Sequence, residues 1–276
     1  MEHIRISRNN LIVMGILFTA YIVIDVLLFD FGTEEFYFML VIQILLAGLS
    51  IIPVGTYIIR FLYGSRTIKL PNDKAYLTPI FNDVYGRVKS EHPKVSKNIK
   101  LYIDNSDMSV NAYALGGNSI TITRGAIENL SDDELKGVIG HEFGHIIHGD
   151  TFLSLFLLLG NSIFLVSLFV GFIAKTTMNV MVAFFPRNQG YRLMRWLLIT
   201  IFSIPLFVIQ ILLMMNSRTN EYKADKYAYE IGLGNHLYLA LNQLSKYSSH
   251  EKTTIMERIK SSHPDISNRI ARLSNM

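Results

Sequence analysis

Four long apolar segments constrain this chain more than any other feature of its sequence. A helix needs about 20 apolar residues to cross a bilayer. The four segments that approach or exceed this length are Leu11–Phe29, Phe36–Ile59, Thr151–Ala174 and Trp196–Met215. Half of all residues are hydrophobic and only 17% are charged, whereas soluble domains contain about 25% charged residues. The sequence therefore predicts a multi-pass membrane protein.

The charges around the apolar segments predict an orientation. The loop Asp30–Glu35 carries acids and no base, and four bases follow the second segment: Arg60, Arg66, Lys69 and Lys74. Because basic residues favour the cytoplasmic side, the polar sequence that follows the second segment is expected in the cytoplasm. The tip Lys175–Arg195 is also basic, so either the last two segments do not fully cross or packing overrides the rule. The first segment is too long for a signal peptide and lacks a cleavage site, which favours an uncleaved anchor.

The apolar segments divide the remaining sequence into two polar blocks. We expect an N-terminal transmembrane pair over 1–61, the first part of a catalytic domain over 62–150, a transmembrane hairpin over 151–215 and the second part of the domain over 216–276. The two polar parts together have the size of one ordinary domain. The chain has no cysteine, which excludes disulfides, thiolate metal sites and a cysteine protease. Lys and Arg form no continuous run, so no nucleic-acid partner is expected.

The polar blocks predict a mainly helical α+β fold with a small sheet. An amphipathic helix is expected over Asn72–Ser90, with Pro79 as a kink or as its true start. Short strands are expected at Leu101–Ile103 and Ile120–Thr123, with a paired or edge strand over Asp107–Leu115 before a Gly-Gly-Asn turn. Ser131 and Glu134 form a capping box, and the helix that it starts should run through His148 into the third apolar segment. Later helices are expected at Thr219–Ile231, Asn235–Tyr247 and Ser267–Leu273.

That capped helix carries the sequence His141-Glu142-Phe143-Gly144-His145, which has the pattern H-E-x-x-H. Residues four apart share one face of a helix, so both imidazoles can bind one metal ion. Glu142 is rotated about 100° from His141, where it can act as a general base toward a bound water. An amphipathic helix that happens to carry two histidines is the alternative. Glycines at 140 and 144 count against it, because glycine weakens a helix unless something must approach closely.

A catalytic zinc site needs a third protein ligand. The longer pattern H-E-x-x-H-x-x-G-x-x-H fails, since His148 and Thr151 stand where Gly and His would be required. A glutamate from a second helix is the other solution. Glu221 and Asp225 lie four residues apart in the sequence E-Y-K-A-D, so Glu221 can bind the metal while Asp225 accepts a hydrogen bond from the Nδ1–H of a zinc histidine. Spacing alone does not separate this from a solvated helix face.

In its ordered series of motifs the chain resembles the HtpX-type membrane zinc metallopeptidases, which are relatives of the CAAX prenyl endopeptidases and of a mitochondrial inner-membrane protease. The matching features, which extend over nearly the whole chain, are two N-terminal spans, N-A-Y-A at 111–114, G-H-E-F-G-H followed by Gly149-Asp150, a hydrophobic hairpin, E-Y-K-A-D, and His263-Pro264 followed by Arg269-Ile270. The resemblance implies a gluzincin-like domain in which one zinc ion is bound by His141, His145 and Glu221, with Glu142 as the base.

The resemblance also suggests residues around the substrate. Asn111, Ala112 and Ala114 match the family's edge strand, which would pair with an extended substrate, although an ordinary strand is the alternative. His263 is a candidate donor to the oxyanion, or a loop histidine before a proline. Arg269 is expected to brace the site through a carboxylate rather than to touch the substrate.

These features together predict a multi-pass zinc metalloendopeptidase of the cell membrane with a cytoplasmic catalytic domain. Its expected partners are the bilayer and protein or peptide substrates. The resemblance favours membrane proteins as substrates and a role in their quality control. The alternatives are a peptidase that processes one particular substrate, such as a prenylated chain, and a non-enzymatic membrane scaffold with a structural metal. CAAX endopeptidases have more spans than the four found here, which favours the quality-control branch.

Overall fold

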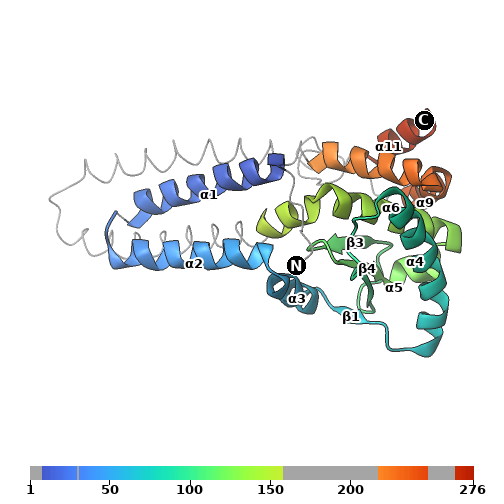
Figure 1. Cartoon of the computed structure of the whole chain (residues 1–276), viewed down its shortest axis with the longest axis horizontal. Coiled ribbons are helices and arrows are strands. Elements are labelled where there is room, and N and C mark those ends of the chain that lie inside the picture. The colour runs from blue at the N-terminus through green and yellow to red at the C-terminus, as the bar shows by residue number, and fades with distance from the viewer. Residues whose placement is uncertain (1–7, 30, 158–216, 248–264) are drawn as a thin grey trace. The chain divides into compact units, whose positions relative to one another are not determined.

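The computed structural model describes residues 8–29, 31–157, 217–247 and 265–276. These residues are mostly helical and include one small mixed sheet (Figure 1), which confirms the predicted α+β class. They fall into two compact units, the first comprising 53–152, 217–247 and 265–276 and the second 8–29, 31–52 and 153–157. The predicted division at 61, 150 and 215 stays a prediction.

The second unit contains a pair of helices, α1 (Arg8–Phe29) and α2 (Glu34–Ile51), that lie side by side. Thr33 caps α2, because its hydroxyl accepts a hydrogen bond from the backbone N–H of Phe36. Both helices carry buried apolar side chains, and four of their described polar residues are buried as well: Asn10, Asp25, Gln43 and Ser50. Asp25 is 1% exposed and accepts a hydrogen bond from Gln43 Nε2.

The second predicted span is interrupted. We expected one helix over Phe36–Ile59, but Ile52 is extended and α3 (Pro53–Leu62) begins at the next residue. Proline can start a helix at no cost, whereas inside one it removes a hydrogen bond. Within the described residues, no single helix is both long and apolar enough to cross a bilayer; Glu34–Ser50 and Val54–Leu62 meet that standard only together, across the break. Most of the third and fourth predicted segments, from residue 158 to 215, lies outside the described residues.

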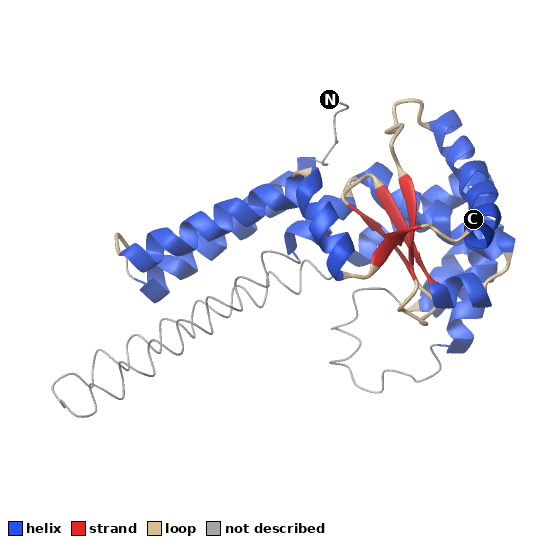
Figure 2. Ribbon diagram, turned by 90° about the horizontal axis from the view of Figure 1, so that it is seen from below, coloured by secondary structure: helices blue, strands red, loops and turns tan. Residues whose placement is uncertain are grey.

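The sheet belongs to the first unit and has the strand order β1-β2-β4-β3 (Figure 2). Its strands are β1 (Ser65–Thr67), β2 (Lys100–Asp104), β3 (Ala112–Leu115) and β4 (Ser119–Thr123). The two central strands, β2 and β4, pair in parallel, and each outer strand pairs antiparallel with its neighbour. Gly116 and Gly117, with φ of 57° and 72°, form the predicted turn between β3 and β4. The strand expected over Asp107–Leu115 is shorter, because residues 107–111 are irregular.

The other described elements of this unit, besides α3, are helical. They are α4 (Pro71–Glu91), α5 (Arg124–Asn129), α6 (Asp132–His148), a helix over 217–228, the π-helical turn η1 (Tyr229–Leu233), α9 (Gly234–Tyr247) and α11 (Ile266–Leu273). Pro79 lies inside α4 and does not end it. The core joins the inner side chains of α4 and α6 to those of β2 and β4, and the rings of Phe81, Tyr85 and Phe143 lie against one another within it.

The helix α6 begins as predicted and ends earlier than expected. Both halves of the capping box are present: Ser131 Oγ accepts from Glu134 N, and Glu134 Oε2 accepts from Ser131 N. At the other end Gly149 takes the left-handed conformation (φ 72°), which satisfies carbonyls of the last turn and stops the helix. The expected run straight into the third apolar segment is therefore wrong. A separate helix occupies residues 150–157.

Three glycines on α6 let other helices approach closely. A Cβ added at Gly144 would lie 2.7 Å from Ala224 Cα, and one at Gly137 would lie 2.3 Å from Leu237 N. At Gly140 the added atom would be 2.8 Å from Leu233 Cδ1. Gly140 and Gly144 thus have the role expected of them: their missing side chains make room for the chain that carries Glu221 and for the turn that follows it.

Candidate metal centre

The two motif histidines face each other on successive turns of α6. Their Nε2 atoms are 3.2 Å apart, and their rings are perpendicular. His141 is 6% exposed, and the neighbouring Glu142 is also buried. The spacing of four residues thus directs both lone pairs to one point.

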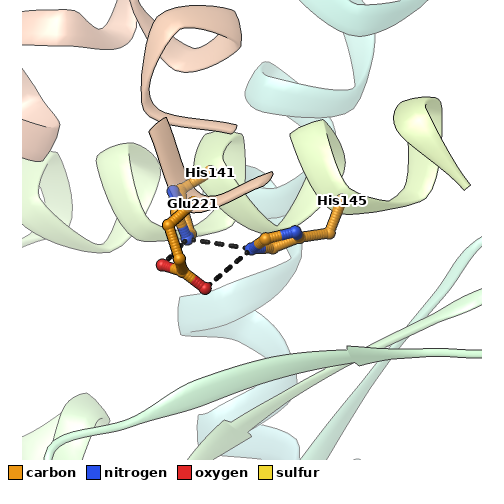
Figure 3. Close-up of side chains that lie close together, drawn as sticks. All are labelled: His141, His145 and Glu221. Atoms are coloured by element: carbon orange, nitrogen blue, oxygen red, sulfur yellow. Dashed lines mark hydrogen bonds and ion pairs between the residues drawn. The ribbon is translucent and has the colours of Figure 1, made fainter. Parts of the chain in front are cut away.

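Glu221 completes this group from the helix over 217–228 (Figure 3). One carboxylate oxygen lies 3.4 Å from His141 Nε2, and the other lies 3.4 Å from His145 Nε2. One ligand atom from each of the three residues lies within 4.8 Å of the others. Glu221 is 3% exposed.

The chemistry and closeness of these atoms suit a small metal ion. Zinc binds imidazole nitrogen and carboxylate oxygen at about 2.0–2.2 Å, so two of its tetrahedral ligands are separated by about 3.3 Å. The two imidazole nitrogens are 3.2 Å apart, and each lies 3.4 Å from a different oxygen of the Glu221 carboxylate. Two histidines and one glutamate are also a donor set found in catalytic zinc sites. The three residues therefore fit a zinc ion in chemistry, and their donor atoms lie close enough together to share one ion.

Each imidazole is held from behind by a carboxylate. Asp225 Oδ1 lies 2.8 Å from His141 Nδ1, and Asp150 Oδ2 lies 3.3 Å from His145 Nδ1. A proton on Nδ1 leaves the lone pair of Nε2 for a metal, so these contacts select the tautomer that can bind. Both carboxylates are buried, which makes the contacts stronger than they would be in water.

Asp150 is a site residue that sequence reasoning missed. From the sequence alone the motif helix was expected to continue through Asp150 into the third apolar segment, which gave this residue no reason to meet His145. Its proximity to His145 depends on the left-handed turn at Gly149, which ends α6 and starts a new helix with Asp150. The Gly-Asp pair at 149–150, one helical turn after the motif, was the available signal, since glycine often marks a helix end.

Arg269 of α11 braces the carboxylates. Its Nε and Nη2 donate to the two oxygens of Asp225 at 2.9 and 2.6 Å, and its Nη1 lies 3.2 Å from Glu221 Oε2. The guanidinium is almost fully buried, and paired hydrogen bonds of this kind fix geometry as well as charge. Arg269 thus contacts the carboxylates, as its predicted role requires.

The carboxylates make the site suited to a cation. Burial lowers the pKa of His145, but the Asp150 and Glu221 carboxylates raise it more, to about 10. Burial raises the pKa of Asp225, yet bonds from His141 and Arg269 lower it more, so this side chain is ionised at neutral pH. A bound metal ion would supply the positive charge that this arrangement favours, and would compete with protons for the histidines.

The remaining predicted residues lie elsewhere or outside the described part of the chain. Ala112 and Ala114 belong to β3, the last strand of the sheet, which packs beside α6. Asn111 precedes that strand and is exposed. Its N–H donates to Thr123 Oγ1 at 3.0 Å. His263 lies outside the described residues, so its predicted role stays a prediction.

Comparison with known proteins assigns the class. The model of peptidase family M48 matches residues 71–276. This match covers most of the chain, and the chain belongs to this family. It is a metallopeptidase.

The similar proteins include proteases named as HtpX homologs. The homolog from Helicobacter acinonychis (strain Sheeba) is 32% identical over 230 residues, covering 75% of this chain and 71% of that protein. One from Helicobacter pylori (strain Shi470) is 33% identical over 206 residues, covering 67% of this chain and 63% of that protein. The chain thus matches between three fifths and three quarters of the length of these relatives. The predicted resemblance to HtpX-type proteases is confirmed.

A solved structure shares the fold. The crystal structure of Ste24p from S. mikatae aligns with a TM-score of 0.54 at 19% identity, over 97% of this chain and 67% of that chain. At this identity the similarity concerns the fold alone.

Proposed function

We propose that this chain is a membrane-anchored zinc endopeptidase that binds one zinc ion through His141, His145 and Glu221. The observation that carries the proposal is the convergence of these three side chains from two helices: the two imidazole nitrogens are 3.2 Å apart, and each lies 3.4 Å from one carboxylate oxygen of Glu221. Two histidines and a glutamate are a donor set of catalytic zinc sites. Glu142 follows the first ligand on the same helix and serves as the general base.

The chain's own residues divide the chemistry among them. Zinc bound here would lower the pKa of a coordinated water to about 7 and polarise the peptide carbonyl. Glu142 takes a proton from the attacking water and passes it to the leaving amine. Asp225 and Asp150 keep the imidazoles in the binding tautomer. Arg269 fixes Asp225 and balances part of the negative charge.

The substrate is an extended peptide that pairs with β3. This strand is at the end of the sheet order and lies beside the metal-binding helix, which supports pairing of its outer edge by backbone hydrogen bonds. Asn111, Ala112 and Ala114 would form that edge, and His263 would donate to the oxyanion. These assignments follow the resemblance to HtpX-type proteases.

The apolar segments support anchorage in the cell membrane with the catalytic unit in the cytoplasm. The helix pair α1–α2 is rich in exposed apolar side chains, which include Leu11, Ile16, Phe38, Val41 and Leu45, and a lipid environment suits such surfaces. Misfolded or damaged membrane proteins are the proposed substrates, because a site next to apolar segments meets chains that leave the bilayer.

One substitution tests the catalytic assignment. The Glu142→Gln variant, purified in detergent, is expected to retain one zinc ion per chain and to lose casein cleavage, because the amide preserves the shape and removes the base. Zinc counting and cleavage are measured on the same preparation. A variant that cleaves like the wild type would exclude Glu142 as the base, whereas a wild-type protein that binds zinc and cleaves nothing would support a scaffold with a structural metal. A processing peptidase would share every residue of the site, and profiling the cleaved substrates separates it from a quality-control protease.

A further inference from the structure

The helix α3 carries an apolar stripe that faces away from the protein. Its large apolar residues on this side follow the spacing i, i+3, i+4, i+7 and i+8, which in soluble proteins marks the face that packs on the core. Here that face is exposed: Val54 is 54% accessible, Tyr57 65%, Ile58 41%, Phe61 61% and Leu62 68%. This surface, called the α3 stripe below, is contiguous along the whole helix. Exposed apolar surfaces of this kind mark binding sites.

The opposite side of α3 is fixed to the catalytic unit. Thr56 and Ile59 are 3% and 4% exposed. Thr56 lies so close to the β3–β4 turn that a Cβ at Gly116 would be 1.9 Å from its hydroxyl oxygen. The guanidinium of Arg60 stacks on the ring of Tyr102 in β2, 4.4 Å from the ring centre. The stripe is therefore held in a defined direction relative to the sheet.

The charges around the stripe identify its partner. The sequence from residue 36 to 72 contains no Asp or Glu, and its bases are Arg60, Arg66 and Lys69. Arg66 and Lys69 are exposed. The Arg66 guanidinium lies 4.8 Å above the ring of Phe61 and donates to the carbonyl oxygen of the same residue, so its positive charge lies beside the apolar face. Aromatic rings, aliphatic side chains and bases in this arrangement are typical of helices that lie at a membrane surface.

We propose that α3 lies in the membrane–water interface, with the α3 stripe among the outer acyl chains and Arg66 and Lys69 against anionic lipid headgroups. The proposal rests on the membrane anchorage proposed above. It adds a lipid-binding surface on the catalytic unit itself, outside the metal site. Thr56 packs against Gly116, which directly follows β3. The α3 stripe would therefore hold this end of β3, the strand proposed to pair with the substrate, next to the bilayer.

Depth measurements on the full chain test this proposal. Since the chain has no cysteine, a single cysteine can carry a nitroxide at position 57, 61 or 90 (Tyr57→Cys, Phe61→Cys, and Ser90→Cys as the exposed control on α4). Each variant is reconstituted in nanodiscs of phosphatidylcholine with or without phosphatidylglycerol. The collision rates of the label with oxygen and with a water-soluble nickel complex are then measured.

Labels at 57 and 61 are expected to have a several-fold higher ratio of oxygen to nickel accessibility than the label at 90, and a depth in the outer part of the acyl region. The ratio should rise further with phosphatidylglycerol, and the Arg66→Gln/Lys69→Gln double substitution should remove that rise, because basic side chains at the surface are attracted to anionic lipid. The proposal would be overturned if the labels at 57 and 61 were as accessible to nickel as the control. It would also be overturned if they lay at the bilayer centre, because α3 would then be part of a span.

The proposals on which this one rests are tested separately. A chain that does not enter nanodiscs would refute the membrane anchorage. Zinc content and casein cleavage of the unlabelled protein test the peptidase assignment.

Discussion

Replacing Gly144 by alanine should weaken the metal site without touching any ligand. The added Cβ would lie 2.7 Å from Ala224 Cα and 3.0 Å from Ala224 Cβ. Carbon atoms in contact prefer about 3.5–4.0 Å, so the helix over 217–228 must withdraw by close to 1 Å. Two of the three close atoms belong to the backbone, and a rotamer change therefore cannot relieve the overlap.

The size of the effect follows from two opposing contributions. Overpacking of this kind costs about 1–3 kcal/mol, and alanine in place of glycine inside a helix returns about 1 kcal/mol. The net loss in unfolding free energy is thus at most about 2 kcal/mol. Glu221 lies one turn before Ala224 on the moving helix, and a shift of about 1 Å at a reacting centre can cost about 100-fold in rate. Zinc affinity should fall with it, because ligand distances tolerate only about 0.2 Å.

The assay compares Gly144→Ala with Gly86→Ala in detergent. Gly86 is exposed inside α4, and a Cβ added there meets nothing within 4 Å. The control should therefore gain stability and keep normal zinc binding and cleavage. Thermal unfolding, zinc competition against a chelator and peptide cleavage are measured for both variants. If Gly144→Ala matches Gly86→Ala in all three, the close approach of the helices does not position Glu221.

Three further outcomes are expected. The Asp150→Asn variant should bind zinc about 10–100-fold more weakly, the usual effect of removing a carboxylate behind a metal histidine, and unchanged affinity in a competition titration would exclude Asp150 from orienting His145. Removal of zinc with a chelator should abolish cleavage and lower the thermal midpoint, because an ion that binds only the folded chain stabilises it; both should return with added zinc, and a midpoint that does not move would contradict the fit of the site. The pKa of Asp73 lies below its usual range because Arg124 donates two hydrogen bonds to it, so this pair stabilises the fold above the unfolded pKa of about 3.9 and less as the pH falls through the folded value. The stability difference between wild type and Asp73→Asn should therefore vanish in acid, and a difference that persists at the lowest pH would contradict the assignment.

Local signals explain which parts of the fold could be predicted. The capping box of Ser131 and Glu134 marks the start of α6, and the spacing of His141 and His145 follows from helical geometry alone. The Gly-Gly-Asn turn lies where expected for a similar reason, because residues at positive φ favour glycine. Each of these features depends on residues within one turn or one hairpin.

Features that depend on distant contacts could not be predicted in the same way. Spacing alone left Glu221 open between a metal ligand and a solvated helix face, since nothing in that segment records its contact with α6. Only the ordered motifs of the family indicated it. The break before Pro53 was missed because apolar composition continues across it, and hydropathy does not distinguish one helix from two. Asp150 was missed because its role depends on the direction of the chain after Gly149.

The same turn accounts for the position of the motif directly beside an apolar run. Had α6 continued straight, residue 150 would lie more than a full helical turn beyond His145, and its carboxylate would be rotated about 140° around the helix axis from that side chain. Because Gly149 stops α6, Asp150 opens the next helix and reaches back to His145 Nδ1. Glu221 follows the other end of the apolar segments and meets the same imidazole through Nε2. The residues that enter and leave the apolar segments therefore bind opposite nitrogens of one ring, so a displacement of either end changes how His145 is held.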